Sequence, residues 1–438
     1  MKLPTYVTAC LDALENAGFP AYAVGGCVRD AVLGKDPQDY DLCTAALPAQ
    51  TQAVFQDHNL VLAGLKHGTV GVITSGGVVE ITTFRTEGGY ADARHPDWVK
   101  FVPHVEEDLS RRDFTVNAMA YSPKWGFRDP FGGQTDLQNH VLRAVGDPDL
   151  RFREDALRIL RGVRFASRFH LTPDKATEQA MFSLAPLMAH LARERVFEEL
   201  CKLLMTATAE DLLRFSPVIT EAIPELKVQV GFDQRTPHHA YDIYTHTAHV
   251  VAHVPADLTL RWAALLHDIG KPHCFTVDEG GRGHFKGHAG VGAELADDIL
   301  RRLKAPNALR EEVVVLIGQH MTRMELDKKF LRRRLSRLGP EMLDKLLRLQ
   351  QADMDSKGVC KDSEKAQFAQ VLSLLAQIQE ESTCLTLKDL AVDGNDLMAL
   401  GFQGKAIGVC LNALLEQVLD ETLPNEKSLL LKAAEAFL

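Results

Sequence analysis

The pattern of hydrophobic and polar residues changes near residue 147. Before this point, a helical period over Thr5–Ala17 is followed by short runs of β-branched and apolar residues, which are typical of strands. After Asp147 and Pro148 the strand signals nearly vanish and the helical period dominates. The pattern therefore predicts an α+β protein, with a small mixed-sheet head followed by a long all-helical region. The expected strands are Ala21–Val24, Tyr40–Thr44, Thr69–Thr74 and Val78–Phe84.

Breaks in this pattern divide the chain into four expected parts. Arg153–Phe169 is a strong helix candidate in the second part, and a break with Pro237 precedes a histidine-rich third part. Ser75–Gly77 is expected to form a hairpin turn, and Arg85–Pro96, with paired glycines and little periodicity, a mobile loop. We name the four parts the head (1–146), the neck (147–232), the body (233–365) and the tail (366–438).

The composition narrows the class of protein. Of the 438 residues, 46% are hydrophobic and 25% charged, which is the balance of a globular protein with real cores. A formal net charge of -10 excludes a generally basic nucleic-acid coat but leaves room for a local basic site. The eight cysteines form no CxxC pair, and Asp12 and Glu15 interrupt the apolar pattern of the N-terminus. No apolar stretch reaches about 18 residues. We therefore expect no membrane partner, no export signal and a reducing, cytoplasmic location.

The sequence GGCVRD, Gly25–Asp30, follows a short expected strand and opens a helix. Two glycines allow the backbone to approach an anion closely, and the N-terminus of a helix offers free N–H donors. Arg29 adds a forked donor that suits phosphate. A phosphate-binding loop and a plain strand-to-helix turn both explain this segment.

Paired carboxylates follow in the segment DYDL, where Asp39 and Asp41 flank Tyr40. On a strand, residues two apart point to the same side, and neighbouring carboxylates are stable only with cations or protons between them. Hard oxygen ligands favour Mg²⁺, and two such ions serve phosphoryl transfer. Glu80 would supply a third carboxylate if its strand lies beside the first. The alternative is a solvated strand face.

These motifs together resemble the polymerase-beta-like nucleotidyltransferases. More closely, they resemble the bacterial CCA-adding enzymes, the class II tRNA nucleotidyltransferases that share their class with bacterial poly(A) polymerases. The resemblance extends to EITTFR, to RRDFTVNAMAY (Arg111–Tyr121) and to EDALRILRGVRF (Glu154–Phe165). It implies that Asp39 and Asp41 hold Mg²⁺. It also implies that the nucleotide is bound by Gly26, Arg29, Arg112, Asp155, Arg158, Arg161 and Arg164.

The neck segment EDALRILRGVR suggests how a base is chosen without a nucleic-acid template. Cytosine and adenine each carry an amine beside an unprotonated ring nitrogen, so an aspartate can accept from the first and an arginine can donate to the second. Asp155 and Arg158, three apart on the expected helix, would read the base in this way. Arg161 and Arg164 lie further round the helix and are expected to reach phosphate or RNA. The alternative is a salt-bridged helix.

The body carries a candidate second metal site. His246, the adjacent His267 and Asp268, and the distant Asp353 resemble the metal site of the HD phosphohydrolase superfamily. Imidazole and carboxylate together suit a divalent transition metal, which could activate water for cleavage of a phosphate ester. An active hydrolase site and a vestigial one that only supports RNA binding both remain open. Further candidates are His284 and His288 as ligands and Lys271 near a phosphate, whereas His249 and His253 are expected to be core residues.

Two further segments are candidates for RNA contact. Lys328–Gly339, KKFLRRRLSRLG, is the densest positive cluster and suits either an RNA-binding stripe or a solvated helix face. Gly401–Gly408 in the tail suits either a phosphate contact before a helix over Val409–Leu419 or a plain turn.

The resulting hypothesis is a template-independent tRNA nucleotidyltransferase that builds or repairs the 3′-terminal CCA of tRNA from CTP and ATP, with no DNA partner. Asp39 and Asp41 would bind two Mg²⁺ ions, Glu80 would assist, and pyrophosphate would leave. One alternative is an A-adding enzyme or a poly(A) polymerase, which would share the head motifs. Another is an HD-type metal-dependent phosphohydrolase whose head only binds nucleotide.

Overall fold

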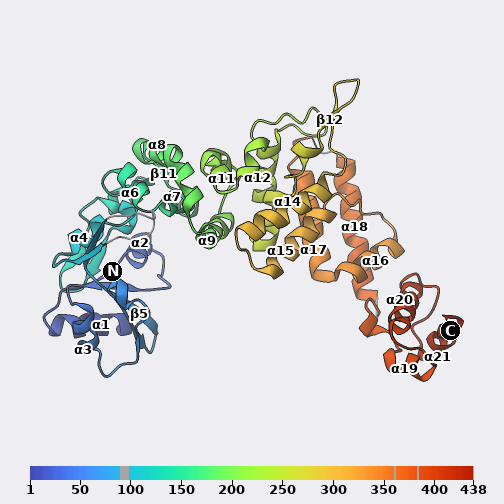
Figure 1. Ribbon diagram of the computed structural model, residues 1–438, viewed down its shortest axis with the longest axis horizontal. Coiled ribbons are helices and arrows are strands. Elements are labelled where there is room, and N and C mark those ends of the chain that lie inside the picture. Colours follow the sequence, from blue (N-terminus) through green and yellow to red (C-terminus); the bar gives the residue numbers. More distant parts are fainter. Residues whose placement is uncertain (89–97, 360–361, 382–383, 438) are drawn as a thin grey trace. The chain divides into compact units, whose positions relative to one another are not determined.

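The computed structural model describes residues 1–88, 98–359, 362–381 and 384–437. The contacts between residues divide the chain into two compact units, which are described separately below. The first unit contains Met1–Lys227 with Arg302–Lys304, and the second contains Val228–Arg301 with Ala305–Leu438. Figure 1 shows the sheet near the N-terminus and helices along the rest of the chain.

A seven-stranded mixed sheet forms the centre of the head, in the order β3-β4-β5-β2-β1-β8-β9. The pairing of β2 with β5 is parallel, and the other neighbours are antiparallel. Every residue of β1 is buried, as expected for a central strand covered on both faces. The strands are β1 (Ala21–Val24), β2 (Asp41–Thr44), β3 (Leu60–Val61), β4 (Thr69–Thr74), β5 (Gly77–Thr83), β8 (Ala120–Ser122) and β9 (Gly126–Arg128).

Short helices flank this sheet and complete the core of the head. Tyr22, Cys43 and Ala120 contribute to one hydrophobic cluster from three different strands, together with Leu109 from a helix. The helix α1 ends just before Gly18, which has a φ of 87°, as the sequence predicted. The helices are α1 (Thr5–Asn16), α2 (Gly26–Val32), α3 (Pro48–Val54), α4 (Val105–Ser110) and α5 (Gly133–Gln138).

Part of the expected loop Arg85–Pro96 is a strand. Arg85–Gly88 forms β6, which pairs in antiparallel register with β7 (Trp98–Phe101). The loop prediction is therefore wrong for Arg85–Gly88, because β7 supplies hydrogen-bond partners that the local sequence does not reveal. The rest of that expected loop lies outside the described residues.

The neck is built from helices, and its predicted long helix is interrupted. Arg153–Phe169 was expected to be continuous, but the chain forms α6 (Pro148–Glu154) and α7 (Leu157–Phe169), with Asp155 extended between them at φ -143° and ψ 103°. The Asp155 carboxylate accepts a hydrogen bond from the backbone N–H of Leu157, which favours this break. The other helices are α8 (Lys175–Leu184), α9 (Arg193–Leu204), α10 (Ala209–Arg214) and α11 (Ser216–Ala222). A short parallel pair joins β10 (Val141–Leu142) to β11 (Thr172–Pro173).

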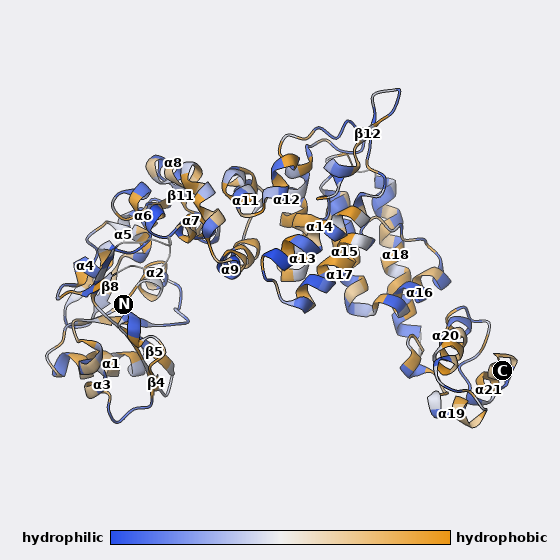
Figure 2. Cartoon of the chain, viewed as in Figure 1, coloured by the Kyte–Doolittle hydropathy of each residue, from blue (hydrophilic) through white to orange (hydrophobic). Residues whose placement is uncertain are grey.

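The body is a largely helical part of the second unit. Its central helix α13 is buried from Thr259 to Leu266, so the residues that follow it emerge inside the protein. Figure 2 shows hydrophobic and hydrophilic residues alternating along these helices, as expected for amphipathic helices around a core. The hairpin of β12 (Thr276–Val277) and β13 (Gly283–His284) departs from the all-helical expectation. The helices are α12 (Ile243–His253), α13 (Leu258–Leu266), α14 (His288–Arg302), α15 (Asn307–Gln319), α16 (Lys328–Leu338), α17 (Pro340–Asp355) and α18 (Asp362–Glu381).

The tail has a hydrophobic cluster of its own. Leu397, Leu414 and Leu430 are fully buried in it, one from each tail helix. Within the described parts of the chain, no helix is both long and apolar enough to cross a membrane. The described cysteines are free, from Cys10 in α1 to Cys410 in the tail. The tail helices are α19 (Gly394–Ala399), α20 (Lys405–Leu419) and α21 (Lys427–Ala434).

Candidate functional site

The head places acidic side chains on neighbouring strands. Asp41 is the first residue of β2, and Glu80 on β5 is its direct partner in the parallel register. Asp39 lies in the link before β2. The expectation that the two aspartates share a strand is therefore wrong. All three carboxylate residues are exposed to solvent.

Negative charge is concentrated around Asp41. Desolvation by the surrounding protein raises the pKa of the Asp41 carboxyl. The nearby charges of Glu80 and Asp39 raise this pKa further, whereas the charge of Arg112 lowers it. Carboxylates placed this close repel one another unless a cation or proton neutralises them. The carboxylate oxygens therefore fit a hard divalent cation such as Mg²⁺.

Gly25 and Arg112 lie beside each other at the start of α2. Gly25 has a φ of 76°, a backbone conformation that favours glycine, and a Cβ atom on it would lie 2.9 Å from Nη1 of Arg112, whose flexible side chain would have to shift. The Nη2 atom of Arg112 is 3.4 Å from a carboxylate oxygen of Asp108, and its buried Nε has no hydrogen-bond partner. Arg112 therefore retains donor capacity close to the acidic residues of the head.

Arg29 is buried and already engaged within the protein. Its Nε and Nη2 donate to Oδ1 of Asp30 at 2.9 and 2.7 Å, and its Nη1 donates to Oδ1 of Asn117 at 2.6 Å. The guanidinium also lies over the ring of Phe169, 4.2 Å from the ring centroid. Because an arginine has five N–H groups, Arg29 keeps two of them for a ligand.

The two residues expected to read a base do not contact each other through their side chains. Asp155 accepts a hydrogen bond from Nη2 of Arg195 at 2.9 Å. Arg195 was not among the residues predicted from the sequence. Arg158 is buried and donates from Nη1 to Glu154 at 2.6 Å and from Nη2 to the backbone oxygen of Arg111 at 3.0 Å. The prediction that Asp155 lies on the same helix as Arg158 is wrong, because Asp155 occupies the break between α6 and α7.

Arg161 and Arg164 point into a buried polar network. Arg161 donates twice to Oδ2 of Asp113, from Nε at 2.9 Å and from Nη2 at 2.7 Å. Arg164 donates from Nε to Oε2 of Glu199 at 2.6 Å. Asn117 donates to Asp113 at 3.1 Å and accepts from Arg29, so the network reaches from the neck back to the start of α2.

Some residues of this network lie in a motif that the sequence reveals, and others do not. Asp113 and Asn117 lie within RRDFTVNAMAY, the motif quoted above, although neither was selected as a site residue. Glu199 and Arg195 lie on α9 in a stretch without any motif, and only the packing of α9 along α7 reveals them.

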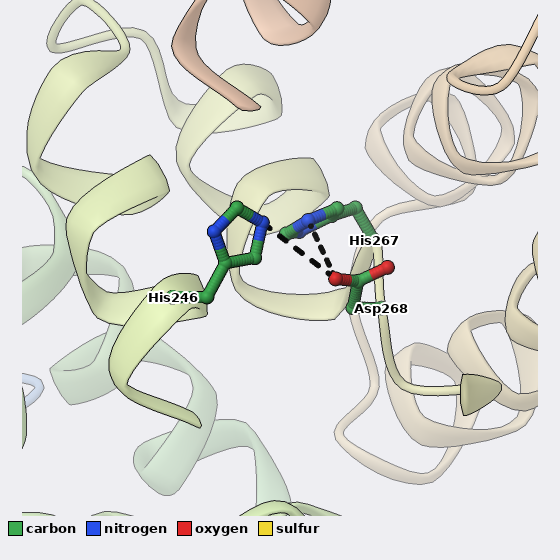
Figure 3. Close-up of side chains that lie close together, drawn as sticks. All are labelled: His246, His267 and Asp268. Carbon is green, nitrogen blue, oxygen red and sulfur yellow. Dashed lines mark ion pairs between the residues drawn. The ribbon is translucent and has the colours of Figure 1, made fainter. Parts of the chain in front are cut away.

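A second candidate site lies inside the body, where α13 ends (Figure 3). His246 Nε2 is 2.9 Å from Oδ1 of Asp353 and 3.7 Å from Oδ2 of Asp268. His267 Nε2 is 3.2 Å from Oδ2 of Asp268 and has no hydrogen-bond partner. The structure therefore brings the four residues of the predicted metal site together. We call this cluster, with His288 and His320, the His–Asp centre.

His288 and His320 complete a second group around the same aspartate. Their Nε2 atoms are 3.4 and 3.9 Å from Oδ1 of Asp268 and 3.3 Å from each other. Within the described residues, two groups have ligand atoms within 4.8 Å of one another: His246, His267 and Asp268 form one, and Asp268, His288 and His320 form the other. The sequence reasoning missed His320, which lies in a stretch without a motif.

The histidines of the His–Asp centre all place Nδ1 beside a backbone oxygen. The Nδ1 atom of each lies within hydrogen-bond distance of a backbone oxygen, at 3.2 Å for His246, 2.8 Å for His267, 2.7 Å for His288 and 2.6 Å for His320. A proton on Nδ1 leaves the lone pair of Nε2 facing the carboxylates, which is the usual arrangement of metal-binding histidines. Burial lowers the pKa of His320 to about 4, so its imidazole is neutral near pH 7. These residues fit a divalent transition metal.

A cavity of about 440 Å³ opens onto the His–Asp centre and is rimmed by cations. Lys271, Arg282, Lys286 and Lys357 line it. Lys271 donates to Gln234 at 2.8 Å and lies 2.7 Å from Asp268, so its ammonium belongs to the centre itself.

Three other histidines named from the sequence lie outside this centre. His284 is 2.8 Å from Asp278 on the exposed hairpin and is not part of either ligand group. His253 is exposed, so the expectation of a core residue is wrong there, because its ring lies at the surface end of α12. His249 is partly buried against the ring of Tyr241.

The basic segment Lys328–Gly339 forms α16, and several of its cations have acidic partners. Arg333 donates to Asp420 at 2.7 Å, Arg332 pairs with Glu421, and Lys328 donates to Glu381 at 2.6 Å. These ion pairs connect α16 to the tail and to α18 rather than leaving a bare positive stripe. In the tail, α20 begins at Lys405, which is earlier than the expected Val409, because Gly404 with a φ of 52° precedes it.

Comparison with known proteins defines the class. The head matches the family described as poly A polymerase head domain over residues 21–143. Residues 170–228 match a probable RNA- and SrmB-binding site of polymerase A, and residues 287–434 match a putative tRNA nucleotidyltransferase domain 2. The sheet-containing head, the helical remainder and these matches define a nucleotidyltransferase of the poly(A) polymerase class, and such a head implies a divalent metal ion.

The similar proteins are CCA-adding enzymes. The enzyme of Latilactobacillus sakei is 32% identical over 99% of this chain and 100% of its own length. The chain belongs to the class II CCA-adding enzymes, as its motifs predicted. The match to the enzyme of Limosilactobacillus reuteri (strain DSM 20016) is 48% identical but covers 44% of this chain, and the chain spans about half (48%) of that relative.

Solved structures agree with this assignment. The CCA-adding enzyme of Bacillus stearothermophilus, crystallised with CTP, is 29% identical and superimposes with a TM-score of 0.72 over 100% of this chain and 98% of its own. The Thermotoga maritima enzyme, solved with tRNA, has a TM-score of 0.59 at 20% identity over 99% of this chain and 96% of its own, and it shares the fold.

Asp113 should contribute a pH-dependent part of the stability. Burial alone would raise the pKa of Asp113, but Arg161 and Asn117 lower it to about 2. The stabilisation is therefore present above the unfolded-state pKa, near 4, and is lost as the pH falls towards 2; it amounts to roughly 2 kcal/mol. We expect Asp113→Asn to lower the free energy of unfolding most near neutral pH, and the difference from the wild type to shrink below about pH 4.

Urea unfolding of both proteins across this pH range measures that difference. Asp57→Asn, at an exposed position of the head, is the control and should follow the wild type. A difference between Asp113→Asn and the wild type that stays constant with pH would contradict the assignment.

Proposed function

We propose that the protein adds or repairs the 3′-terminal CCA of tRNA, using CTP and ATP and no nucleic-acid template. The observation that carries this proposal is the similarity to a CCA-adding enzyme along essentially the whole chain, combined with carboxylates on adjacent strands of a nucleotidyltransferase head. The CTP and tRNA named for the structurally similar enzymes support the same substrates. The proposed domain functions are catalysis in the head (1–146), base selection in the neck (147–232), RNA support in the HD-like body (233–365) and tRNA binding in the tail (366–438).

In this proposal Asp39 and Asp41 hold two Mg²⁺ ions, and Glu80 assists. Bound Mg²⁺ neutralises charge on the triphosphate and makes the attacking hydroxyl more acidic. The 3′-oxygen of the tRNA forms a bond to the α-phosphorus, the bond from that phosphorus to the β-phosphate oxygen breaks, and pyrophosphate leaves. The hydroxyl proton passes to solvent. Because the 3′-oxygen attacks the α-phosphorus directly, no covalent enzyme intermediate is required.

The chain positions the triphosphate with its own donors. The backbone at Gly25 and Gly26 allows close approach, and Arg112 lies beside it with an unpaired Nε. Arg29 retains two N–H groups for a phosphate oxygen. Holding the reacting groups in line in this way supplies much of the acceleration expected of phosphoryl transfer.

The choice of base is proposed to depend on Asp155 and Arg158. Asp155 would accept from the amine of cytosine or adenine, and Arg158 would donate to the ring nitrogen through the N–H groups that its internal contacts leave unused. Uracil and guanine present the opposite groups, so their binding would leave buried polar atoms unpaired. Arg161 and Arg164 are proposed to reach phosphate or RNA through the N–H groups that Asp113 and Glu199 leave unused.

Asp41→Asn should abolish nucleotide addition. Removal of one carboxylate charge weakens cation binding next to the triphosphate, so we expect the rate of C or A addition to fall at least about 100-fold. The assay supplies each labelled NTP separately to tRNA transcripts that end before, within or after CCA, and a sequencing gel reads the products. Addition of A alone, or of long A tracts, would identify an A-adding enzyme or a poly(A) polymerase instead.

The matched control is Asp57→Asn, which should add CCA at the wild-type rate. Electrophoretic mobility shift measures tRNA binding, which Asp41→Asn should retain because Asp41 lies in the head and not in the proposed tRNA-binding tail. Wild-type turnover by Asp41→Asn would refute the proposed metal role.

A second candidate function rests on the His–Asp centre. Its two ligand groups share Asp268, and the cation-rimmed cavity beside it fits an anionic phosphate ester. We propose that the centre hydrolyses phosphate monoesters when it holds transition-metal ions, which supply charge neutralisation and acidify water. Water adds to phosphorus, the P–O bond of the ester breaks, and the alcohol leaves with a proton from the water.

Metal analysis tests this second function directly. In full-length protein carrying Asp41→Asn, loaded with Mn²⁺ or Ni²⁺ and desalted, we expect Asp268→Asn to lower the metal content most, because both ligand groups contain Asp268. His320→Ala should lose only the ion of one group. Hydrolysis of p-nitrophenyl phosphate should fall in both variants.

His273→Ala, at an exposed position of the same unit, is the control and should retain both metal and turnover. Absence of bound transition metal together with absence of turnover in the parent protein would exclude the hydrolase function without affecting the proposed CCA addition.

A further inference from the structure

The carboxylate of Asp155 is held at both of its oxygen atoms. Oδ1 accepts from the backbone N–H of Leu157 at 3.0 Å, and Oδ2 accepts from Nη2 of Arg195 at 2.9 Å. These two donors come from α7 and from α9, which pack along each other. The plane of the carboxylate is therefore set by two helices and not by the rotamer preference of Asp155 alone.

This carboxylate can still bind a ligand. An ionised aspartate offers about four lone-pair positions, of which Leu157 and Arg195 occupy two. The side chain of Asp155 is 17% exposed and that of Arg195 is 26% exposed, so both can be reached from the solvent side. An exocyclic amine could therefore bind the remaining lone pairs without displacing either donor.

Arg195 holds Asp155 through a single nitrogen. Its other terminal nitrogen, Nη1, is buried and has no hydrogen-bond partner. One turn further along α9, Glu199 binds Arg164 and lies 3.8 Å from Arg161. The neighbouring basic residues of α7 thus have an acidic partner of their own, and Arg195 is the arginine that the structure pairs with Asp155.

From this geometry we propose that Arg195 is a positioning residue for base selection, an inference that rests on the proposed nucleotide addition. Arg195 keeps the Asp155 carboxylate in the orientation that accepts the amine of cytosine or adenine. Uracil and guanine present a carbonyl oxygen to this carboxylate in place of an amine, so the fixed orientation of Asp155 disfavours them. Arg158, which Glu154 and two backbone oxygens restrain, would supply the donor to the ring nitrogen.

Substitution of Arg195 should reduce selectivity more than it reduces folding. In Arg195→Met, Asp155 loses its side-chain partner and can rotate, so we expect the ratio of kcat/KM for CTP and ATP over that for UTP and GTP to fall about 10-fold, the effect of one hydrogen bond to a charged group. Arg195→Lys keeps a charged donor and should recover much of the ratio. The assay uses the full chain with tRNA transcripts that lack part or all of CCA.

Arg193→Met is the matched control, two residues away on the same helix, where the guanidinium donates to the backbone oxygen of Ala189 at 2.7 Å. It should keep the wild-type ratio. The double variant Asp155→Asn with Arg195→Met should be no less selective than Asp155→Asn alone, because Arg195 acts through Asp155.

Two outcomes separate the inference from the function on which it rests. If Arg195→Met lowers the melting temperature or slows all four nucleotides equally while the selectivity ratio stays at the wild-type value, Arg195 is only a structural ion-pair partner and the inference is wrong. If the wild-type protein adds neither C nor A to any transcript, the proposed function itself fails.

Discussion

The buried ion pair between Asp113 and Arg161 is the interaction on which the proposed nucleotide site depends. Removal of a carboxylate from water is expensive, and a buried ion pair recovers that cost only with good geometry and further hydrogen bonds. Asp113 has both, because Arg161 donates to it twice and Asn117 once. Since Asn117 also accepts from Arg29, one connected network joins Arg29 of the head to the helix that carries the neck arginines. Loss of this pair would release both ends of the site together.

The His–Asp centre follows a different physical rule. Within each of its two ligand groups, the imidazoles and the Asp268 carboxylate are buried with ligand atoms within 4.8 Å of one another, and His267 Nε2 has no hydrogen-bond partner. Polar atoms in such a setting normally find partners, so an arrangement that leaves nitrogen lone pairs facing carboxylates suits a bound cation better than a packed core. Lys271 and Lys357 lie next to Asp268 and Asp353 and balance part of the negative charge.

Basic residues elsewhere in the chain form more ion pairs within the protein than the sequence suggested. The basic helix α16 was a candidate RNA stripe, yet Arg332 and Arg333 pair with consecutive acidic residues of the tail, Glu421 and Asp420. Such pairs are individually weak at the surface, but they connect α16 to the tail. In an acidic protein that is proposed to bind tRNA, part of the positive charge therefore orders the protein itself.

The sequence by itself determined the local elements and motifs: the strand at Ala21–Val24, the glycine turn before α2, the carboxylates at Asp39 and Asp41, and the family to which they point. These features depend on residues a few positions apart, and the hydrophobic period and turn chemistry report them directly. Only the tertiary structure decided the pairing of Asp155 with Arg195 and the place of His320 beside Asp268. Both contacts join residues 40 or more positions apart, so they depend on how helices pack and on which buried charges need a partner.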